Sequence, residues 1–158
     1  MRALNALEAG FTGAGTLTLL HELLKQVDAD APRMDLLAMD ALSKFIKVPA
    51  PRVYNNTSAY DITLLGDVLS NSLYYSLIGL GKEKNALFNG AMLGSLAGIG
   101  AVSLPEKLGL EEQYSKRTNR TKIMTIGLYL VGGIMAAFSY KNNMQHKQQK
   151  PLKRKKKS

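Results

Sequence analysis

The sequence predicts an all-α fold, an integral membrane four-helix bundle. Four apolar stretches are each about as long as a membrane-spanning helix. The stretches carry small residues at every fourth position, and most charged residues lie between and after them. Small residues at this spacing let helices in lipid approach closely, whereas each glycine in a soluble helix costs about 1 kcal/mol relative to alanine. We therefore predict a membrane domain over residues 1–140, followed by a disordered basic tail over residues 141–158.

The first predicted span covers about residues 3–24. Ala6, Gly10, Ala14 and Thr18 form a ladder of small residues along it, so one face of this helix is shaped to meet a neighbour. An acidic residue near its start interrupts the apolar run. This stretch is therefore the weakest of the four spans.

An amphipathic helix is predicted at about residues 32–48, between spans one and two. Apolar residues recur there at helical spacing, while Asp40 and Lys44 lie on the opposite face. The helix is too short to cross about 30 Å of hydrocarbon. We expect it to lie in the membrane interface.

The other predicted spans cover about residues 62–80, 85–104 and 123–140. The last two contain no charged residue. The connection from Gly81 to Lys84 is so short that spans two and three should be antiparallel neighbours.

The helices are expected to pack through small residues, which we assign as Gly10, Ala14, Gly90, Gly94, Gly98, Gly132 and Gly133. Faces of this kind also associate with other helices in the membrane. The expected protein partners are accordingly a second copy of the chain or another membrane protein.

Four spans place both termini on one side of the membrane. That side receives eleven Lys and Arg residues and the other receives ten, so the positive-inside rule does not choose an orientation. A basic run at the C-terminus suits the anionic head groups of a cytoplasmic leaflet, and its members are Lys153, Arg154, Lys155, Lys156 and Lys157. We therefore predict cytoplasmic termini and a tail that contacts lipid head groups.

A polar cluster is predicted near the opposite end of the bundle, made of His21, Glu22, Thr63, Asp67, Ser70, Asn71, Tyr74 and Glu106. Five of these follow one stripe along span two. An ionisable residue inside a span marks a functional site by default, although polar residues also simply bridge helices. The structural interpretation is favoured, and the alternative is a pathway for a proton or small solute.

No catalytic, cofactor-binding or metal-ligating residue is expected. The chain has no cysteine, and His21 beside Glu22 has no third ligand at a suitable spacing. Neither a dinucleotide fingerprint nor a phosphate-loop lysine is present. The tail lacks interleaved aromatic residues, so no specific nucleic acid is expected. An enzyme acting on lipid head groups through Asp67 and Glu22 has no motif in its support.

Five stretches are familiar together, namely His21–Glu22, residues 28–37, Gly66–Asp67, residues 70–76 and residues 127–133. In them the chain resembles a family of small multi-span bacterial membrane proteins that has no assigned activity. The similarity covers most of residues 5–140 and excludes the tail. The resemblance implies a bacterial inner-membrane location, and it implies no substrate or cofactor.

The sequence thus predicts a non-enzymatic integral membrane protein, a structural or interaction component that packs through glycine-rich helix faces. The alternative function is a transporter or channel subunit that uses the polar stripe of span two. The alternative fold is a soluble helical protein.

Overall fold

The computed structural model describes residues 2–45, 47 and 57–155, with backbone alone from residue 146 onward. The described residues are helical and include no strand. The elements are α1 (Arg2–Val27), α2 (Met34–Phe45), α4 (Thr57–Ser76), the 3-10 helices η1 (Leu77–Leu80) and η2 (Glu83–Asn85), α5 (Ala86–Lys107), α6 (Gln113–Lys116) and α7 (Asn119–Lys155). The predicted all-α class is therefore confirmed.

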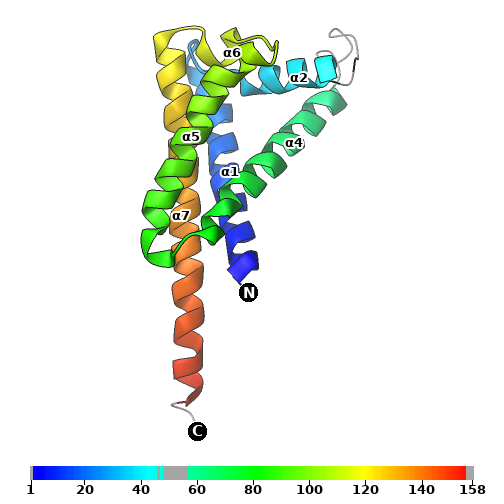
Figure 1. Ribbon diagram of the computed structural model, residues 1–158. Coiled ribbons are helices and arrows are strands. Elements are labelled where there is room, and N and C mark those ends of the chain that lie inside the picture. The colour runs from blue at the N-terminus through cyan, green and yellow to red at the C-terminus, as the bar shows by residue number, and fades with distance from the viewer. Residues whose placement is uncertain (1, 46, 48–56, 156–158) are drawn as a thin grey trace.

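The long helices lie side by side in the order α5, α7, α1, α4 (Figure 1). The start of α1 lies at the same end as η1 and η2, whereas α2 and α6 lie at the other end. α4 slants away from α1, so the two helices stand apart near α2 and meet near η1 (Figure 1). The four long helices thus form a row in which α4 is splayed away from the other three.

The contact between α5 and α7 is built on glycine. Gly90 and Gly133 face each other so closely that a Cβ atom on either would overlap the other's carbonyl oxygen. A Cβ atom on Gly94 would lie 2.5 Å from the carbonyl oxygen of Tyr129, and one on Gly98 would lie 2.7 Å from a backbone Cα atom of α7. We call this contact the glycine seam.

Small residues also join α1 to both of its neighbours. Gly10 lies against the carbonyl oxygen of Ser72 on α4, and a Cβ atom on Gly13 would lie 2.6 Å from the carbonyl oxygen of Gly132 on α7. Ala14 is fully buried beside them. Small residues thus bring the backbones together at these contacts, while larger side chains such as Leu17, Tyr75 and Tyr140 are buried between the helices.

The predicted pairing of spans two and three is wrong. α4 and α5 follow each other through the short turn from η1 to η2, yet they make few contacts with each other. α4 packs on α1 instead, and α5 packs on α7. A short connection brings two helix ends together, but the small-residue faces decide which helices lie in contact.

The predicted amphipathic helix is present as α2, which runs crosswise at the end of the row (Figure 1). Its polar face is turned inward at Asp40 and is exposed at Lys44. Asp40 is buried, and its carboxylate accepts hydrogen bonds from the Glu111 N–H at 2.7 Å and from Lys44 Nζ at 2.9 Å. Lys44 also donates to the Gly109 carbonyl oxygen at 2.7 Å. The polar face of α2 therefore holds the turn after α5.

The expected disorder of residues 141–158 is also wrong as far as Lys155, because α7 continues through the tail. Lysine, glutamine and leucine favour helix, and extending an existing helix avoids the cost of starting one. Lys156 and Lys157, two of the expected lipid contacts, lie outside the described residues. Lys153, Arg154 and Lys155 are described by their backbone only.

Two helical segments are long and apolar enough to cross a membrane, Glu83–Lys107 and Asn119–Gln145. They correspond to the third and fourth predicted spans. The core helix of a soluble protein is mostly buried, but only 17% of the apolar window in the first segment is buried. α1 and α4, with 26 and 20 residues, are long enough but do not reach the same apolarity.

Candidate functional site

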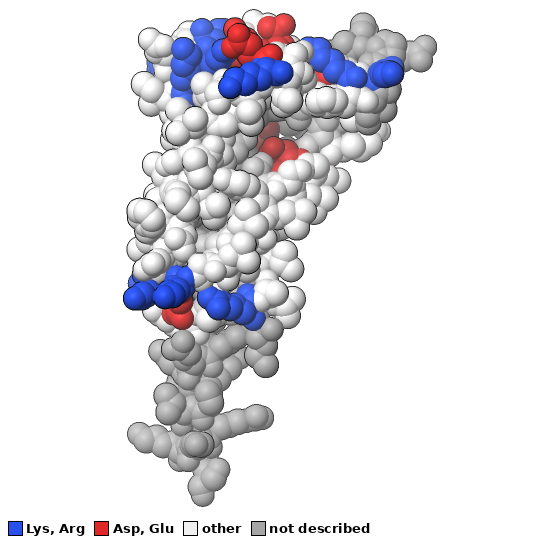
Figure 2. Space-filling model, in the orientation of Figure 1, with Lys and Arg blue, Asp and Glu red and all other residues white. Residues whose placement is uncertain are grey.

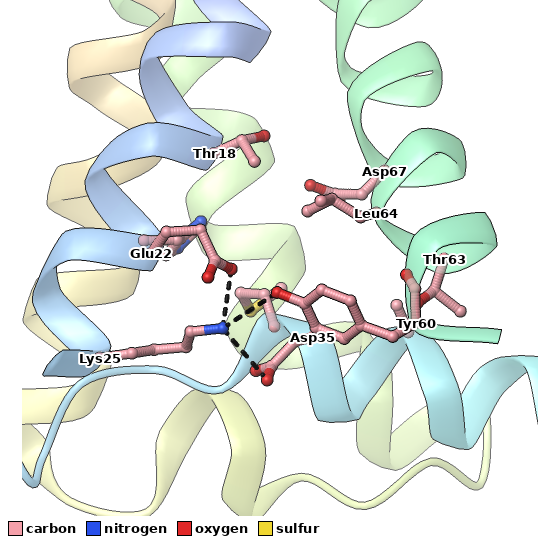
Figure 3. Close-up of a pocket in the computed structure, with 11 residues that line it drawn as sticks. Thr18, Glu22, Lys25, Asp35, Tyr60, Thr63, Leu64 and Asp67 are labelled. Carbon is pink, nitrogen blue, oxygen red and sulfur yellow. Dashed lines mark hydrogen bonds and ion pairs between the residues drawn. The ribbon is translucent and has the colours of Figure 1, made fainter. Parts of the chain in front are cut away.

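A small polar cavity lies where α1 and α4 separate beneath α2 (Figure 3). It measures about 20 Å³, enough for roughly one water molecule. Its lining comes from all three helices and consists of Thr18, His21, Glu22, Lys25, Met34, Asp35, Ala38, Tyr60, Thr63, Leu64 and Asp67. We call this space the inner cavity.

Lys25 forms the centre of the charged wall of the inner cavity. Its Nζ lies 2.7 Å from Glu22 Oε1, 3.3 Å from Asp35 Oδ2 and 3.4 Å from the Tyr60 hydroxyl (Figure 3). Burial opposes the charge of Lys25, but the hydrogen bond to Glu22 and the charge of Asp35 outweigh it. The pKa of Lys25 is therefore raised above its ordinary value of 10.5.

Asp35 is held by Arg33 as well as by Lys25. Arg33 donates to its carboxylate from Nε at 3.1 Å and from Nη2 at 3.0 Å. Burial disfavours the Asp35 carboxylate, but the hydrogen bond from Arg33 and the charge of Lys25 outweigh that penalty. The pKa of Asp35 is lowered below its ordinary value of 3.8. This group of ion pairs ties α1 to α2.

His21 and Thr18 contribute polar atoms without a protein partner. His21 is 6% exposed, its ring lies edge-on to Tyr129 with centroids 5.9 Å apart, and its Nε2 is buried without a hydrogen bond. Thr18 Oγ1 is likewise buried and unpartnered. Buried polar atoms are usually satisfied by protein or water, so these two atoms can bind a water molecule or a donor group in the inner cavity.

Asp67 lies across the inner cavity from Thr18 (Figure 3). Its carboxylate accepts a hydrogen bond from Asn71 Nδ2 at 3.0 Å. Thr63, one turn away, uses its hydroxyl to donate to the Tyr60 carbonyl oxygen at 2.8 Å. No described cation lies within ion-pair distance of Asp67.

The remaining members of the predicted polar cluster lie elsewhere. Ser70 is exposed on the outer side of α4, and the Tyr74 hydroxyl donates to the Leu93 carbonyl oxygen at 2.9 Å. Glu106 is paired with Lys116 at 2.7 Å beside α6. The structure therefore brings His21, Glu22, Thr63 and Asp67 to one cavity, with Asn71 behind them, and separates Glu106 from it.

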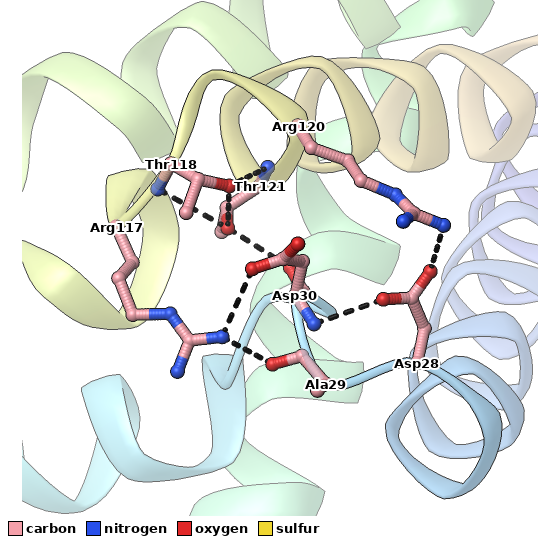
Figure 4. A network of polar contacts seen from close by, with 7 residues as sticks. All are labelled: Asp28, Ala29, Asp30, Arg117, Thr118, Arg120 and Thr121. Atoms are coloured by element: carbon pink, nitrogen blue, oxygen red, sulfur yellow. Dashed lines mark hydrogen bonds and ion pairs between the residues drawn. The ribbon is translucent and has the colours of Figure 1, made fainter.

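A second polar network fastens the turn between α1 and α2 to the start of α7 (Figure 4). Arg120 lies 2.5 Å from Asp28, and Arg117 lies 3.1 Å from Asp30. The Thr121 hydroxyl donates to the Asp30 carbonyl oxygen at 2.9 Å. This network positions the end of α1, and with it Lys25, relative to the rest of the molecule.

Lys25, Asp35 and Tyr60 are site residues that sequence reasoning missed. The spacing of Glu22 and Lys25 at i, i+3 gave a partial signal. The contacts of Lys25 with Asp35 and Tyr60 cross between helices, so only the fold reveals them. The described residues contain no group of three acidic or histidine side chains that could hold a metal ion.

The comparisons give no family assignment. No family model matches the chain, and no match is found among curated proteins or solved structures.

Proposed function

We propose that the chain is an integral membrane protein in which α1, α4, α5 and α7 cross the bilayer and α2 lies in the interface. In this proposal it serves as a structural or interaction component of a bacterial inner membrane, with both termini in the cytoplasm. The observation that carries the proposal is the distribution of large apolar side chains.

These side chains point outward on all four long helices. Those exposed include Leu4, Phe11, Leu19, Ile62, Leu65, Leu69, Leu73, Phe88, Met92, Leu96, Ile99, Ile123, Val131, Met135 and Phe138. The fully buried residues include many small ones, Ala9, Ala14, Thr121, Thr125 and Ala137, beside a few large ones, Leu17, Tyr75, Ile78 and Tyr140. A soluble monomer rarely exposes so much contiguous apolar surface, whereas lipid solvates it and rewards small residues between helices.

Charge supports the same proposal. On the face that Figure 2 shows, most of the described charged side chains form two bands, and the wide surface between them is uncharged except for an acidic group in a recess. α5 has 22 residues, which corresponds to about 33 Å at 1.5 Å per residue and matches the hydrocarbon thickness. The predicted interface helix α2 lies at one of the charged ends (Figures 1 and 2).

The glycine faces support a structural role inside the chain. Gly10, Gly90, Gly94, Gly98 and Gly133 all touch helices of the same molecule, so a partner would meet the outward leucine and phenylalanine side chains. The basic end of α7 is proposed to contact anionic head groups as the helix leaves the membrane.

Single cysteines test the topology directly, because the chain has none of its own. We would place one each at Ala29, Lys82 and Gln113 and label intact cells with a membrane-impermeant maleimide. Four spans require Ala29 and Gln113 to be labelled from one side and Lys82 from the other. If only α5 and α7 cross, Ala29 and Lys82 share a side. Release of the chain by carbonate without detergent would contradict membrane insertion altogether.

A second candidate function, passage of a proton or small solute, is favoured by the inner cavity and the unpaired carboxylate of Asp67. Liposomes containing the purified chain would be given a proton gradient and compared with empty liposomes. Transport requires faster decay of the gradient, slowed by Asp67→Asn. Equal decay in all three preparations would remove this candidate.

A further inference from the structure

An open groove runs along the outside of the inner cavity, between α2 and α4. It has a volume of about 470 Å³, which lies in the range of small-molecule sites. Its walls are mainly apolar, and its lining consists of Ala38, Ala41, Leu42, Phe45, Ile62, Thr63, Gly66, Asp67 and Ser70. We call it the outer groove.

Asp67 joins the outer groove to the inner cavity. Ala38, Thr63 and Asp67 line both spaces, so the carboxylate stands at the junction with apolar walls on one side and polar atoms on the other. Among the described residues, only Asn71, a neutral amide, is hydrogen-bonded to it. A carboxylate in such surroundings is costly unless a cation compensates it.

The described residues around the junction supply no such cation. Lys25 is the one basic residue in the lining of either space, and it is held by Glu22 and Asp35. The hydroxyl oxygens of Thr63 and Ser70 can accept hydrogen bonds beside Asp67, and the Thr63 hydroxyl already uses its hydrogen on the Tyr60 carbonyl oxygen. The junction is therefore complementary to a ligand that carries positive charge and several N–H donors.

We propose that the outer groove binds an organic ammonium ion with an apolar tail. The ammonium group pairs with the carboxylate of Asp67 and donates to the neighbouring hydroxyl oxygens, while the tail lies between α2 and α4 against Leu42, Phe45 and Ile62. This site goes beyond the structural role proposed above. It is measurable in detergent micelles, so its failure and a failure of the membrane topology are separate results.

Equilibrium dialysis of radiolabelled phenylbutylammonium against the purified full chain in a nonionic detergent tests the site. We expect saturable binding that phenylbutanol, the uncharged analogue, does not displace. Asp67→Asn should weaken binding by roughly tenfold or more, because it removes the charge and keeps the shape. Asp61→Asn, an exposed acid on the same helix, should leave binding unchanged.

A steric variant keeps the test decisive if Asp67→Asn does not fold. A Cβ atom on Gly66 meets nothing within 4 Å, so Gly66→Leu fills the outer groove without disturbing a helix contact and should abolish binding. Gly15→Leu, also in open space, is the control and should bind like the wild type. Absence of saturable binding, equal displacement by phenylbutanol, or undiminished binding by Gly66→Leu would each overturn the proposal.

Discussion

The glycine seam and the junction of α1 with α4 are two solutions to helix contact within one chain. Along the seam, Gly90, Gly94 and Gly98 bring the backbones of α5 and α7 together with no room for a methyl group. Between α1 and α4 the same close contact exists only at Gly10. Toward α2 the helices part, and the space holds Lys25, Asp67 and an inner cavity.

The two regions differ in what they favour: the glycine seam favours stability, and the region between α1 and α4 favours binding. Close backbone contact maximises dispersion between helices that gain little from apolar burial in lipid. The splayed region gives up that contact and encloses polar atoms such as His21 Nε2 and Thr18 Oγ1, whose burial costs free energy. Regions that sacrifice stability in this way are typical of functional sites, so the four predictions below compare the two regions.

The largest effect is expected in the glycine seam. Gly94→Leu places a side chain against the Tyr129 carbonyl oxygen and Leu130 Cα, 2.5 and 2.7 Å from its Cβ atom. Backbone cannot yield cheaply, so the free energy of unfolding should fall by about 3 kcal/mol or more. Thermal unfolding in detergent measures the loss. Gly127→Leu, whose Cβ atom meets nothing within 4 Å, should unfold at or above the wild-type temperature.

A smaller effect is expected at the buried hydroxyl where α4 meets α7. The Tyr75 hydroxyl is fully buried and donates to the Tyr129 carbonyl oxygen at 2.7 Å. Tyr75→Phe removes one hydrogen bond and should cost about 1 kcal/mol. Tyr74→Phe, whose hydroxyl is partly buried, should cost less in the same unfolding measurement. An equal or larger loss at Tyr74 would contradict the assigned burial.

The ion pairs that Asp35 forms with Lys25 and Arg33 predict a weak dependence of stability on pH. Because the pKa of Asp35 is lowered, its contribution is complete above 3.8 and is lost as the pH falls through the lower pKa of the folded state. The contribution should be about 1 kcal/mol or less. Unfolding temperatures of the wild type and Asp35→Asn should converge in acid and differ at neutral pH. A constant difference down to the acid limit would rule out this linkage.

The smallest effect on stability, and the one of opposite sign, is expected at Asp67. Asp67→Asn removes a charge with no described cation partner and keeps an amide that can interact with Asn71. The unfolding temperature should stay the same or rise slightly. A marked loss of stability would make Asp67 a structural residue and would weaken the contrast between the two regions.

Much of the fold follows from local pattern, and most of the site does not. The apolar runs and the polar residues between them place α1, α2, α4 with η1, α5 and the start of α7 within a few residues of the predicted bounds, because helix formation depends on near neighbours. Which helices pair is a non-local property, and the short turn at Gly81 misled the prediction. The continuation of α7 past residue 140 was missed because polar composition suggested disorder, although the lysine, glutamine and arginine residues that make up most of this segment favour helix.

The site was predicted as a polar cluster from spans one and two with Glu106 after span three, and the structure forms it from α1, α2 and α4 instead. Thr63, Asp67 and Asn71 share a face by spacing alone. Lys25 and Asp35 lie ten residues apart in the sequence and meet only because the turn after α1 folds back. The opening between α1 and α4 depends on the slant of α4 (Figure 1), and no residue pattern encodes that slant locally.

The second polar network, in which Arg117 and Arg120 hold Asp30 and Asp28 (Figure 4), has a consequence for biosynthesis. Arg117 and Arg120 are 87 and 92 residues further along the chain than the aspartates that they hold. While the ribosome is still making α5, the turn after α1 has neither of these arginines, and α1 lacks the Gly132 surface on which Gly13 rests. α1 therefore gains its contacts with α7 only after α7 has been made, and these helices can complete their assembly only then.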